Sequence, residues 1–214
     1  MRGVVRKEGI TMGYYIRVLV ESDRYIPVSD LRKELKKNNL PVNLDVIEGN
    51  QKEWEQIAIK NEKNEVIAVA ERNLVAEGLL GKEEIEEFLE EIQECKPESA
   101  VEWLKEYLPR IKVIYAFRIL DPIYNDNGWD IVDKVKEKLW NELEGILQAD
   151  MEGFSNKDGY HILWQFDDEV EGDWWMAVRK NDEWIKFRMD LGNKAQRKAF
   201  LEGNVPDGIS VIKT

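Results

Sequence analysis

Alternating apolar and polar residues between positions 174 and 191 predict a long β-hairpin. If Asn181 and Asp182 form its two-residue turn, Lys180 lies opposite Glu183, and the register of every outer pair follows. One face then carries an apolar strip made of Trp174, Met176, Val178, Ile185, Phe187 and Met189. The other face carries Trp175, Ala177, Arg179, Trp184, Lys186 and Arg188. The apolar strip must be buried. On the second face, cation–π contacts can stabilise the side chains while they stay partly exposed to solvent, so this face needs no ligand.

Apolar periodicity along the rest of the chain predicts further strands and helices. The predicted strands cover residues 14–20, 44–47, 54–60, 65–71, 112–120, 146–154 and 160–166. The predicted helices follow an N-cap at Ser29, cover 82–94, 98–108 and 129–143, and begin again at Asn193, which forms a capping box with Gln196. In the hairpin of 54–60 and 65–71 we expect Lys60 opposite Glu65, with both faces apolar and buried.

This order of elements predicts an α+β fold with mainly antiparallel sheets and helices on one face. The series resembles two related β-α-β-(β)-β-β-α halves, residues 13–96 and 97–214, with a boundary at Cys95 to Pro97. One similarity between the halves is an arginine at the centre of a strand, Arg17 in the first half and Arg118 in the second. The alternative is a single α+β domain with two hairpins.

Residues 1–12 lack periodicity and are interpreted as an upstream extension. Lys7, Glu8 and Gly9 are compatible with codons that contain a bacterial ribosome-binding sequence, two codons before Met12. The hypothesis is a bacterial protein whose translation starts at Met12. The alternative is a short basic tail.

Composition restricts the function more than the fold. The chain has 214 residues, of which 43% are hydrophobic, and eight tryptophans, enough for a real core. A net charge of −12 disfavours a nucleic-acid surface, because phosphate contacts need clustered lysine and arginine. One cysteine and one histidine exclude an internal disulfide and a cysteine or histidine metal cluster. Without a long apolar run or a signal peptide, the sequence predicts a cytoplasmic protein that does not cross a membrane.

Much of the negative charge lies on one predicted helix, residues 82–94. That stretch has one lysine and seven glutamates, among them Glu83, Glu87 and Glu90. Its apolar residues Ile85, Phe88, Leu89 and Ile92 repeat at helical spacing, so one stripe should dock while the glutamates face water.

Two other polar stretches invite a metal-binding interpretation. The stretch 121–130 fails as a calcium loop, because Ile123 and Lys134 occupy positions that require carboxylates; a glycine turn leading into the next helix explains it better. The acidic cluster 167–173 is typical of a hydrated loop, with a weak cation site as the alternative. No P-loop, dinucleotide fingerprint, nucleophile elbow or zinc-protease motif is present, and no metal or cofactor is expected.

The alternation of side chains along the predicted strands places one set of potentially catalytic residues on the same face. If 146–154 pairs with 160–166, His161 lies opposite or diagonal to Glu152. If the long hairpin continues that sheet, one polar face collects Gln148, Asp150, Glu152, His161, Gln165, Trp175, Arg179, Trp184, Lys186 and Arg188. A carboxylate beside the imidazole would favour its charged form, and the cations could bind an anion. The alternative is an ordinary solvent-facing sheet surface.

The sequence therefore leaves two functional hypotheses open. The leading one is a non-enzymatic binding module of inhibitor or immunity type that uses its acidic surface against a basic protein partner. In that case Glu83, Glu87 and Glu90, together with the Trp175, Arg179, Trp184, Lys186 and Arg188 face, are the candidate binding residues. The alternative is a small-molecule enzyme or ligand-binding protein with His161 and Glu152 or Asp150 as acid and base. The oligomeric state stays open.

Overall fold

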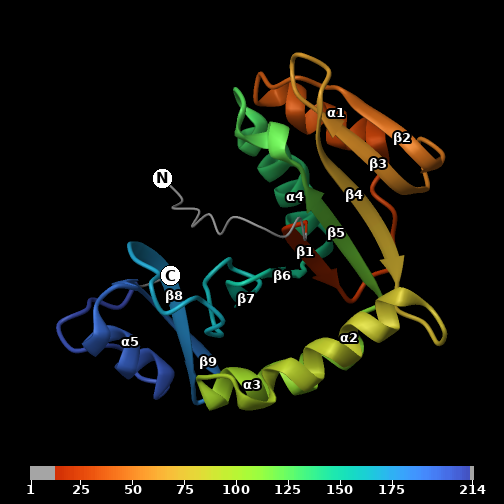
Figure 1. Ribbon diagram of the computed structural model, residues 1–214. Helices are drawn as coiled ribbons and strands as arrows, with labels where there is room; N and C mark the ends of the chain where they lie inside the picture. The colour runs from red at the N-terminus through yellow and green to blue at the C-terminus, as the bar shows by residue number, and fades with distance from the viewer. Residues whose placement is uncertain (1–12, 213–214) are drawn as a thin grey trace. The chain divides into compact units, whose positions relative to one another are not determined.

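The computed structural model describes residues 13–212, and within them the fold is α+β, as predicted. A seven-stranded antiparallel sheet has the order β2-β3-β4-β5-β1-β6-β7, and β8 and β9 form a separate two-stranded sheet. The strands are β1 (Tyr15–Val20), β2 (Leu44–Gly49), β3 (Trp54–Lys60), β4 (Val66–Leu74), β5 (Val113–Ile119), β6 (Ile146–Ala149), β7 (Gly153–Ser155), β8 (Asp173–Lys180) and β9 (Glu183–Asp190). The α-helices are α1 (Val28–Lys37), α2 (Leu80–Glu91), α3 (Glu98–Tyr107), α4 (Gly128–Leu143) and α5 (Lys194–Leu201) (Figure 1).

The chain forms two compact units, which we name by their main element. The sheet unit comprises residues 13–85 and 110–149, and the hairpin unit comprises 86–109 and 150–212. The division falls inside α2, and each unit takes residues from both predicted halves. The duplication is therefore not confirmed, and the halves 13–96 and 97–214 stay a prediction. The predicted extension, residues 1–12, lies outside the described residues.

The core of the sheet unit lies between the sheet and two helices. Strand β1 lies inside the sheet and pairs antiparallel with β5 and β6. Helices α1 and α4 contact each other, and α4 packs on β1, β3 and β4 (Figure 1). Helix α4 was predicted over 129–143, and its apolar stripe at helical spacing is buried throughout: Ile131, Val132, Val135, Leu139 and Leu143. No helix among residues 13–212 has the length and apolar content that crossing a membrane requires.

The start of α1 differs from the prediction by two residues. The N-cap is Pro27, with φ −60°, and the helix begins at Val28. The Ser29 hydroxyl lies 3.4 Å from the Asp30 carboxylate instead of capping a backbone N–H. The predicted Ser29 cap is therefore wrong, because proline, with its fixed φ and no N–H, is itself compatible with a helix start.

The register of β3 and β4 is shifted by two residues from the prediction. Ile59 lies opposite Ala68, and Lys60 lies opposite Val66 after a bulge, so the predicted Lys60–Glu65 pair is wrong. The buried Asn61 explains the shift, because its side chain accepts from the Glu65 N–H at 3.0 Å and donates to the Glu65 carboxylate at 2.8 Å. A shift of two keeps the side chains of 56–59 and 68–71 on their predicted faces.

The predicted strand 146–154 is broken in the structure. Its two ends are β6 and β7, and the residues between them form a turn in which Met151 has φ +61°. Gly153 then has φ +109°, and a Cβ on it would lie 2.5 Å from the Leu163 carbonyl oxygen. The chain turns here because only glycine tolerates that approach.

The predicted strand 160–166 is also wrong, since only isolated bridges form there. Its backbone bonds go to several partners: His161 to β8, Ile162 to Phe154 at 2.8 Å, and Trp164 to Lys96 at 2.9 Å. A segment whose N–H and C=O groups alternate between partners forms no continuous ladder. The predicted extension of one sheet through β8 and β9 fails for the same reason, and these strands form their own sheet.

Helices α2 and α5 follow their sequence signals closely. Ile85, Phe88 and Ile92 are buried along α2 and the 3-10 turn after it, while Leu89 is half-buried. Asn193 caps α5 by accepting from the N–H groups of Ala195 and Gln196. The reciprocal half of the predicted capping box is replaced, because the Gln196 side chain accepts from the Asp190 N–H at 2.8 Å.

Removing the Phe88 ring should destabilise the hairpin unit. Phe88 is 5% exposed and meets Phe154 edge to face at 5.5 Å, so Phe88→Ala should lower the free energy of unfolding by about 3–5 kcal/mol through loss of packing and a residual cavity. Glu87→Ala, one residue away and exposed, should change it by less than about 0.5 kcal/mol. Urea unfolding measures both, and equal losses would show that α2 does not dock through this stripe.

Candidate functional site

The β8–β9 hairpin has the predicted register over its whole length. Asn181 and Asp182 form the turn with φ +51° and +66°, and Lys180 lies opposite Glu183. Two consecutive positive φ values are typical of a type I′ turn, whose twist matches that of the strands. The predicted apolar strip forms a core with α5. The residues of this core are Phe166, Met176, Val178, Phe187, Met189, Leu191 and Phe200, and Trp174 and Ile185 pack against it half-buried.

On the opposite face of this hairpin, each cation already has a partner. Arg188 lies over the Trp175 ring at 5.7 Å and pairs with Asp173 at 3.0 Å. Lys186 pairs with Asp158 at 2.8 Å and lies 5.2 Å from the centre of the Tyr160 ring.

The rest of that face is arranged differently from the prediction. Arg179 pairs with Asp182 at 3.0 Å, and the Trp184 ring meets Trp103 of α3 edge to face at 5.2 Å. Ala177 is fully buried, so this part of the face is packed and only the end at Trp175, 53% exposed, stays open. As a binding surface, the face is therefore limited to the neighbourhood of Trp175 and Arg188.

His161 is buried at the centre of the hairpin unit. Its Nε2 lies 2.8 Å from the backbone carbonyl oxygen of Glu152, which can only accept, so Nε2 carries the proton. Its Nδ1 lies 3.4 Å from the Ser155 hydroxyl, and the ring packs against Phe166 at 4.6 Å and Trp174 at 5.7 Å. His161 thus tethers the turn before β7 to the aromatic core.

Burial determines the protonation of His161. It lowers the pKa of the imidazole from 6.5 to about 4, although hydrogen bonds to the carbonyls of Glu152 and Leu163 act in the opposite direction. The sequence led us to expect a charged imidazole beside a carboxylate. The direction is the reverse, because the nearest oxygen belongs to the Glu152 backbone and the surroundings are apolar.

The remaining residues of the predicted polar face do not form one surface. Gln148 belongs to the sheet unit, where its side chain accepts from Arg17 at 2.7 Å. Asp150 and Glu152 lie half-buried in the turn that breaks the predicted strand. The Gln165 N–H donates to the Glu152 carbonyl at 3.2 Å.

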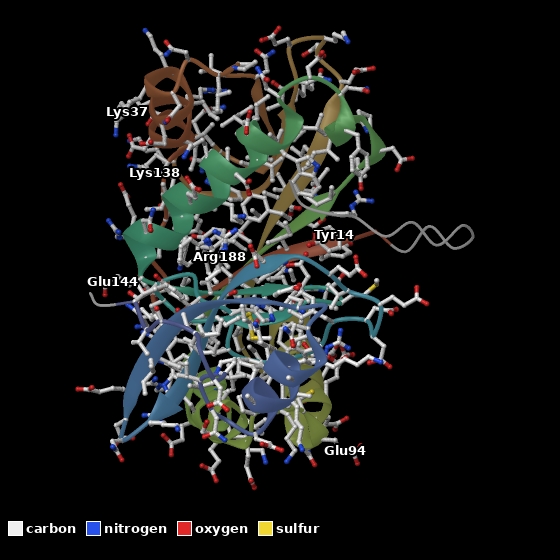
Figure 2. All side chains as sticks on the ribbon, turned by 90° about the vertical axis from the view of Figure 1, so that its left-hand side faces the viewer. Tyr14, Lys37, Glu94, Lys138, Glu144 and Arg188 are labelled. Carbon is white, nitrogen blue, oxygen red and sulfur yellow. The ribbon has the colours of Figure 1, made fainter. Side chains whose placement is uncertain are left out.

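Of the surfaces predicted from the sequence, the solvent side of α2 carries the most charge. Glu83, Glu87 and Glu90 are exposed and have no ion-pair partner among residues 13–212. Glu94, labelled in Figure 2, is exposed in the 3-10 turn after the helix. Glu84 is the exception, because it turns toward the sheet and pairs with Arg17.

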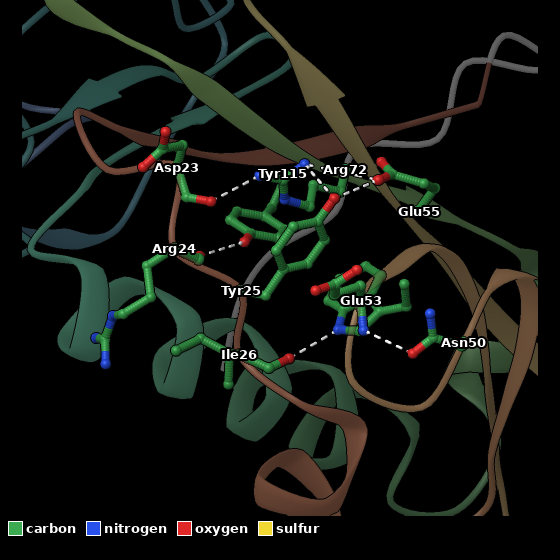
Figure 3. A network of polar contacts seen from close by, with 10 residues as sticks. Asp23, Arg24, Tyr25, Ile26, Asn50, Glu53, Glu55, Arg72 and Tyr115 are labelled. Atoms are coloured by element: carbon green, nitrogen blue, oxygen red, sulfur yellow. Dashed lines mark hydrogen bonds and ion pairs between the residues drawn. The ribbon is translucent and has the colours of Figure 1, made fainter.

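A buried polar network in the sheet unit was not predicted (Figure 3). Arg72 on β4 is 4% exposed and donates to the Tyr25 hydroxyl at 3.1 Å and the Asp23 carbonyl at 2.9 Å. Tyr25 donates to the Glu55 carboxylate at 2.6 Å, and this bond is the main reason why the pKa of Tyr25 is raised. The network holds the loop between β1 and α1. The alternation of side chains along β4 could have predicted the burial of Arg72, because Arg72 lies on the same strand face as Ala68 and Ala70, which face the core.

The acidic stretch 167–173 forms a loop beside an open pocket. Glu171, Asp173 and Asp190 line this pocket, with a volume of about 480 Å³, together with Gly172 and Gly192. No group of three metal-ligating side chains is close enough to hold a metal ion in the part of the chain that the structure describes. Gly128, in the rejected calcium loop, is the first residue of α4, as the glycine turn predicted.

No protein-family model, curated protein or solved structure matches this chain.

The burial of His161 should make folding stability depend on pH. The folded pKa is below the unfolded value, so the unfolded chain binds the extra proton, and stability falls as pH decreases from about 6.5 toward 4. Between pH 7 and pH 5 we expect this residue to cost about 2 kcal/mol of unfolding free energy. Urea titrations at both values measure it, and His161→Gln should remove this part of the slope.

The same pKa can be read directly, since His161 is the single histidine. Its imidazole proton signal in NMR should titrate near pH 4 in the folded protein. A midpoint near 6.5 would contradict the buried, neutral state.

Proposed function

We propose that this protein is a binding module that engages a basic protein partner through the acidic side of α2, in the manner of an inhibitor or immunity protein. The observation that carries the proposal is that Glu83, Glu87 and Glu90 of α2 are exposed and have no ion-pair partner among residues 13–212. The proposal rests on charge and geometry, because no related protein contributes to it.

The charges of α2 differ from those on other helices of the chain. On α4, Lys134 pairs with Glu137 at 2.6 Å, and on α1, Lys33 pairs with Asp30 at 2.7 Å. On α2, no lysine or arginine lies three or four positions from Glu83, Glu87 or Glu90. Glu83 and Glu87 are four residues apart, as are Glu87 and Glu91, and like charges at this spacing repel each other by a few tenths of a kcal/mol per pair.

The end of α2 adds a second unfavourable interaction. The last turn contains no basic residue but contains Glu90 and Glu91, where the helix carries partial negative charge. A carboxylate there is disfavoured by about 0.3–1 kcal/mol at low ionic strength. A cationic partner would relieve both kinds of repulsion, which supports a role for this surface in binding rather than in stability.

The small-molecule alternative has less support. It requires His161 to exchange protons near neutrality, and the lowered pKa and the bond to the Glu152 carbonyl argue against that role. Conversion of a substrate by the wild-type protein but not by His161→Gln would favour this alternative.

Replacing the exposed charges should slow association with a basic partner. The triple variant Glu83→Gln, Glu87→Gln, Glu90→Gln should associate about tenfold more slowly at low ionic strength, because the long-range field that steers encounter is weakened. The difference should shrink as salt shortens the screening length. Stopped-flow mixing with a purified partner, first identified by affinity capture, measures the rate.

A matched control removes the same charge elsewhere. Glu48, Glu62 and Glu106 are exposed and lie outside α2, so their change to glutamine should leave the rate nearly unchanged. If both triple variants slow association equally, the effect depends on net charge alone and not on α2. If the α2 variant does not slow association, the proposal is contradicted.

A further inference from the structure

The junction between β4 and α2 exposes a group of leucines. Leu80, the first residue of α2, is 73% exposed, Leu79 is 44% exposed, and Leu74 at the end of β4 is 42% exposed (Figure 1). Glu83 follows Leu80 by three positions, so the two side chains are neighbours on the helix surface. All four residues belong to the sheet unit. Single exposed leucines are common, but a group of them marks a candidate interaction surface.

The end of β4 and the start of α2 are held close together. A Cβ on Gly81 would lie 2.5 Å from the backbone carbonyl oxygen of Leu74, so only glycine permits this approach. The backbone N–H of Val75, the next residue, donates to the Lys112 carbonyl at 2.8 Å. The junction is therefore anchored by its backbone, and its leucines are presented to solvent from an ordered frame.

The start of α2 does not explain why leucines occupy these positions. The Leu79 carbonyl accepts from the N–H groups of Lys82 at 3.0 Å and Glu83 at 3.4 Å, which places Leu79 at the N-cap. Leucine is disfavoured there, because its side chain cannot accept a hydrogen bond from the first N–H groups of the helix. Leu80 gains little from burial, since most of its side chain is exposed. Contact with another molecule would explain both residues.

The charges beside these leucines select the kind of partner. Glu77 precedes Leu79 and Leu80 in the chain, Glu83 follows them, and both glutamates are exposed. A second copy of the chain, placed against the same surface, would bring like charges together, and an anionic lipid surface would repel them. Protein interfaces commonly have an apolar centre and a charged rim. A protein surface with an apolar patch flanked by lysine or arginine is complementary to the junction in both respects.

We propose that Leu74, Leu79 and Leu80 form the apolar centre of the surface that binds the basic partner. An apolar patch of the partner packs on these leucines, and a cation beside that patch pairs with Glu83. This inference rests on the proposed function, because the same partner is attracted by the acidic side of α2. It adds a division of roles: charge mainly sets the rate of association, and apolar contact sets the rate of dissociation.

The test uses a peptide that carries both features of such a partner. The probe is a dye-labelled peptide of about 18 residues, long enough to form a helix, that contains only leucine and lysine, with its leucines in one stripe. The control peptide has the same composition with its leucines distributed around the helix. Stopped-flow fluorescence with the full chain measures association and dissociation at a concentration where both peptides are monomeric. The striped peptide should dissociate about fivefold more slowly than the control peptide, because only its leucines can contact the junction together.

Variants at the junction separate apolar contact from charge. The double variant Leu79→Ser, Leu80→Ser should release the striped peptide about tenfold faster, with an almost unchanged association rate, because two leucine contacts are lost and no charge is. Serine at position 79 can cap α2, so urea unfolding should show no loss of stability. Ile47→Ser, which removes an apolar side chain that is 56% exposed on β2, is the matched control and should behave as the wild type does.

The outcomes distinguish this inference from the proposed function. Equal dissociation rates for the wild type and the double variant, or no saturable binding of the striped peptide, would overturn the inference. Lower stability of the double variant would show a structural role for the leucines and would also overturn it. The proposed function fails separately, if the Glu83→Gln, Glu87→Gln, Glu90→Gln variant associates with both peptides as fast as the wild type does.

Discussion

The alternation of side chains along antiparallel strands is the constraint on which this structure depends. A strand that slips by one residue moves every side chain to the other face, so a fixed register decides what is buried. The turn at Asn181 and Asp182 sets the β8–β9 register and with it the core against α5. In β3 and β4 the Asn61 loop shifts the register by two residues. Because the shift is even, the paired side chains of the two strands stay on their predicted faces.

Burial decides which polar residues can act chemically. His161 occupies a position that its sequence context made a candidate acid or base, yet it is surrounded by Phe166 and Trp174 and bonded to a backbone carbonyl. Arg72 shows the opposite outcome: it is buried, but Tyr25, Glu55 and the Asp23 carbonyl compensate it. Both residues stabilise loops through the hydrogen bonds that they make, although the buried Arg72 Nε has no acceptor among residues 13–212.

Negative charge is concentrated on the solvent side of α2. The glutamates of α2 repel one another and face solvent, which suits long-range attraction of a cationic protein surface.

The sequence alone determined the fold class, the docking stripe of α2, the helix stripe of α4 and the register of β8 and β9. These features depend on local periodicity and turn chemistry, which neighbouring residues encode. Tertiary structure decided the break at Met151, the loss of a strand at 160–166 and the burial of His161. Each of these depends on which distant backbone or side chain supplies a hydrogen bond, as Lys96 does for Trp164, and periodicity carries no information about such partners.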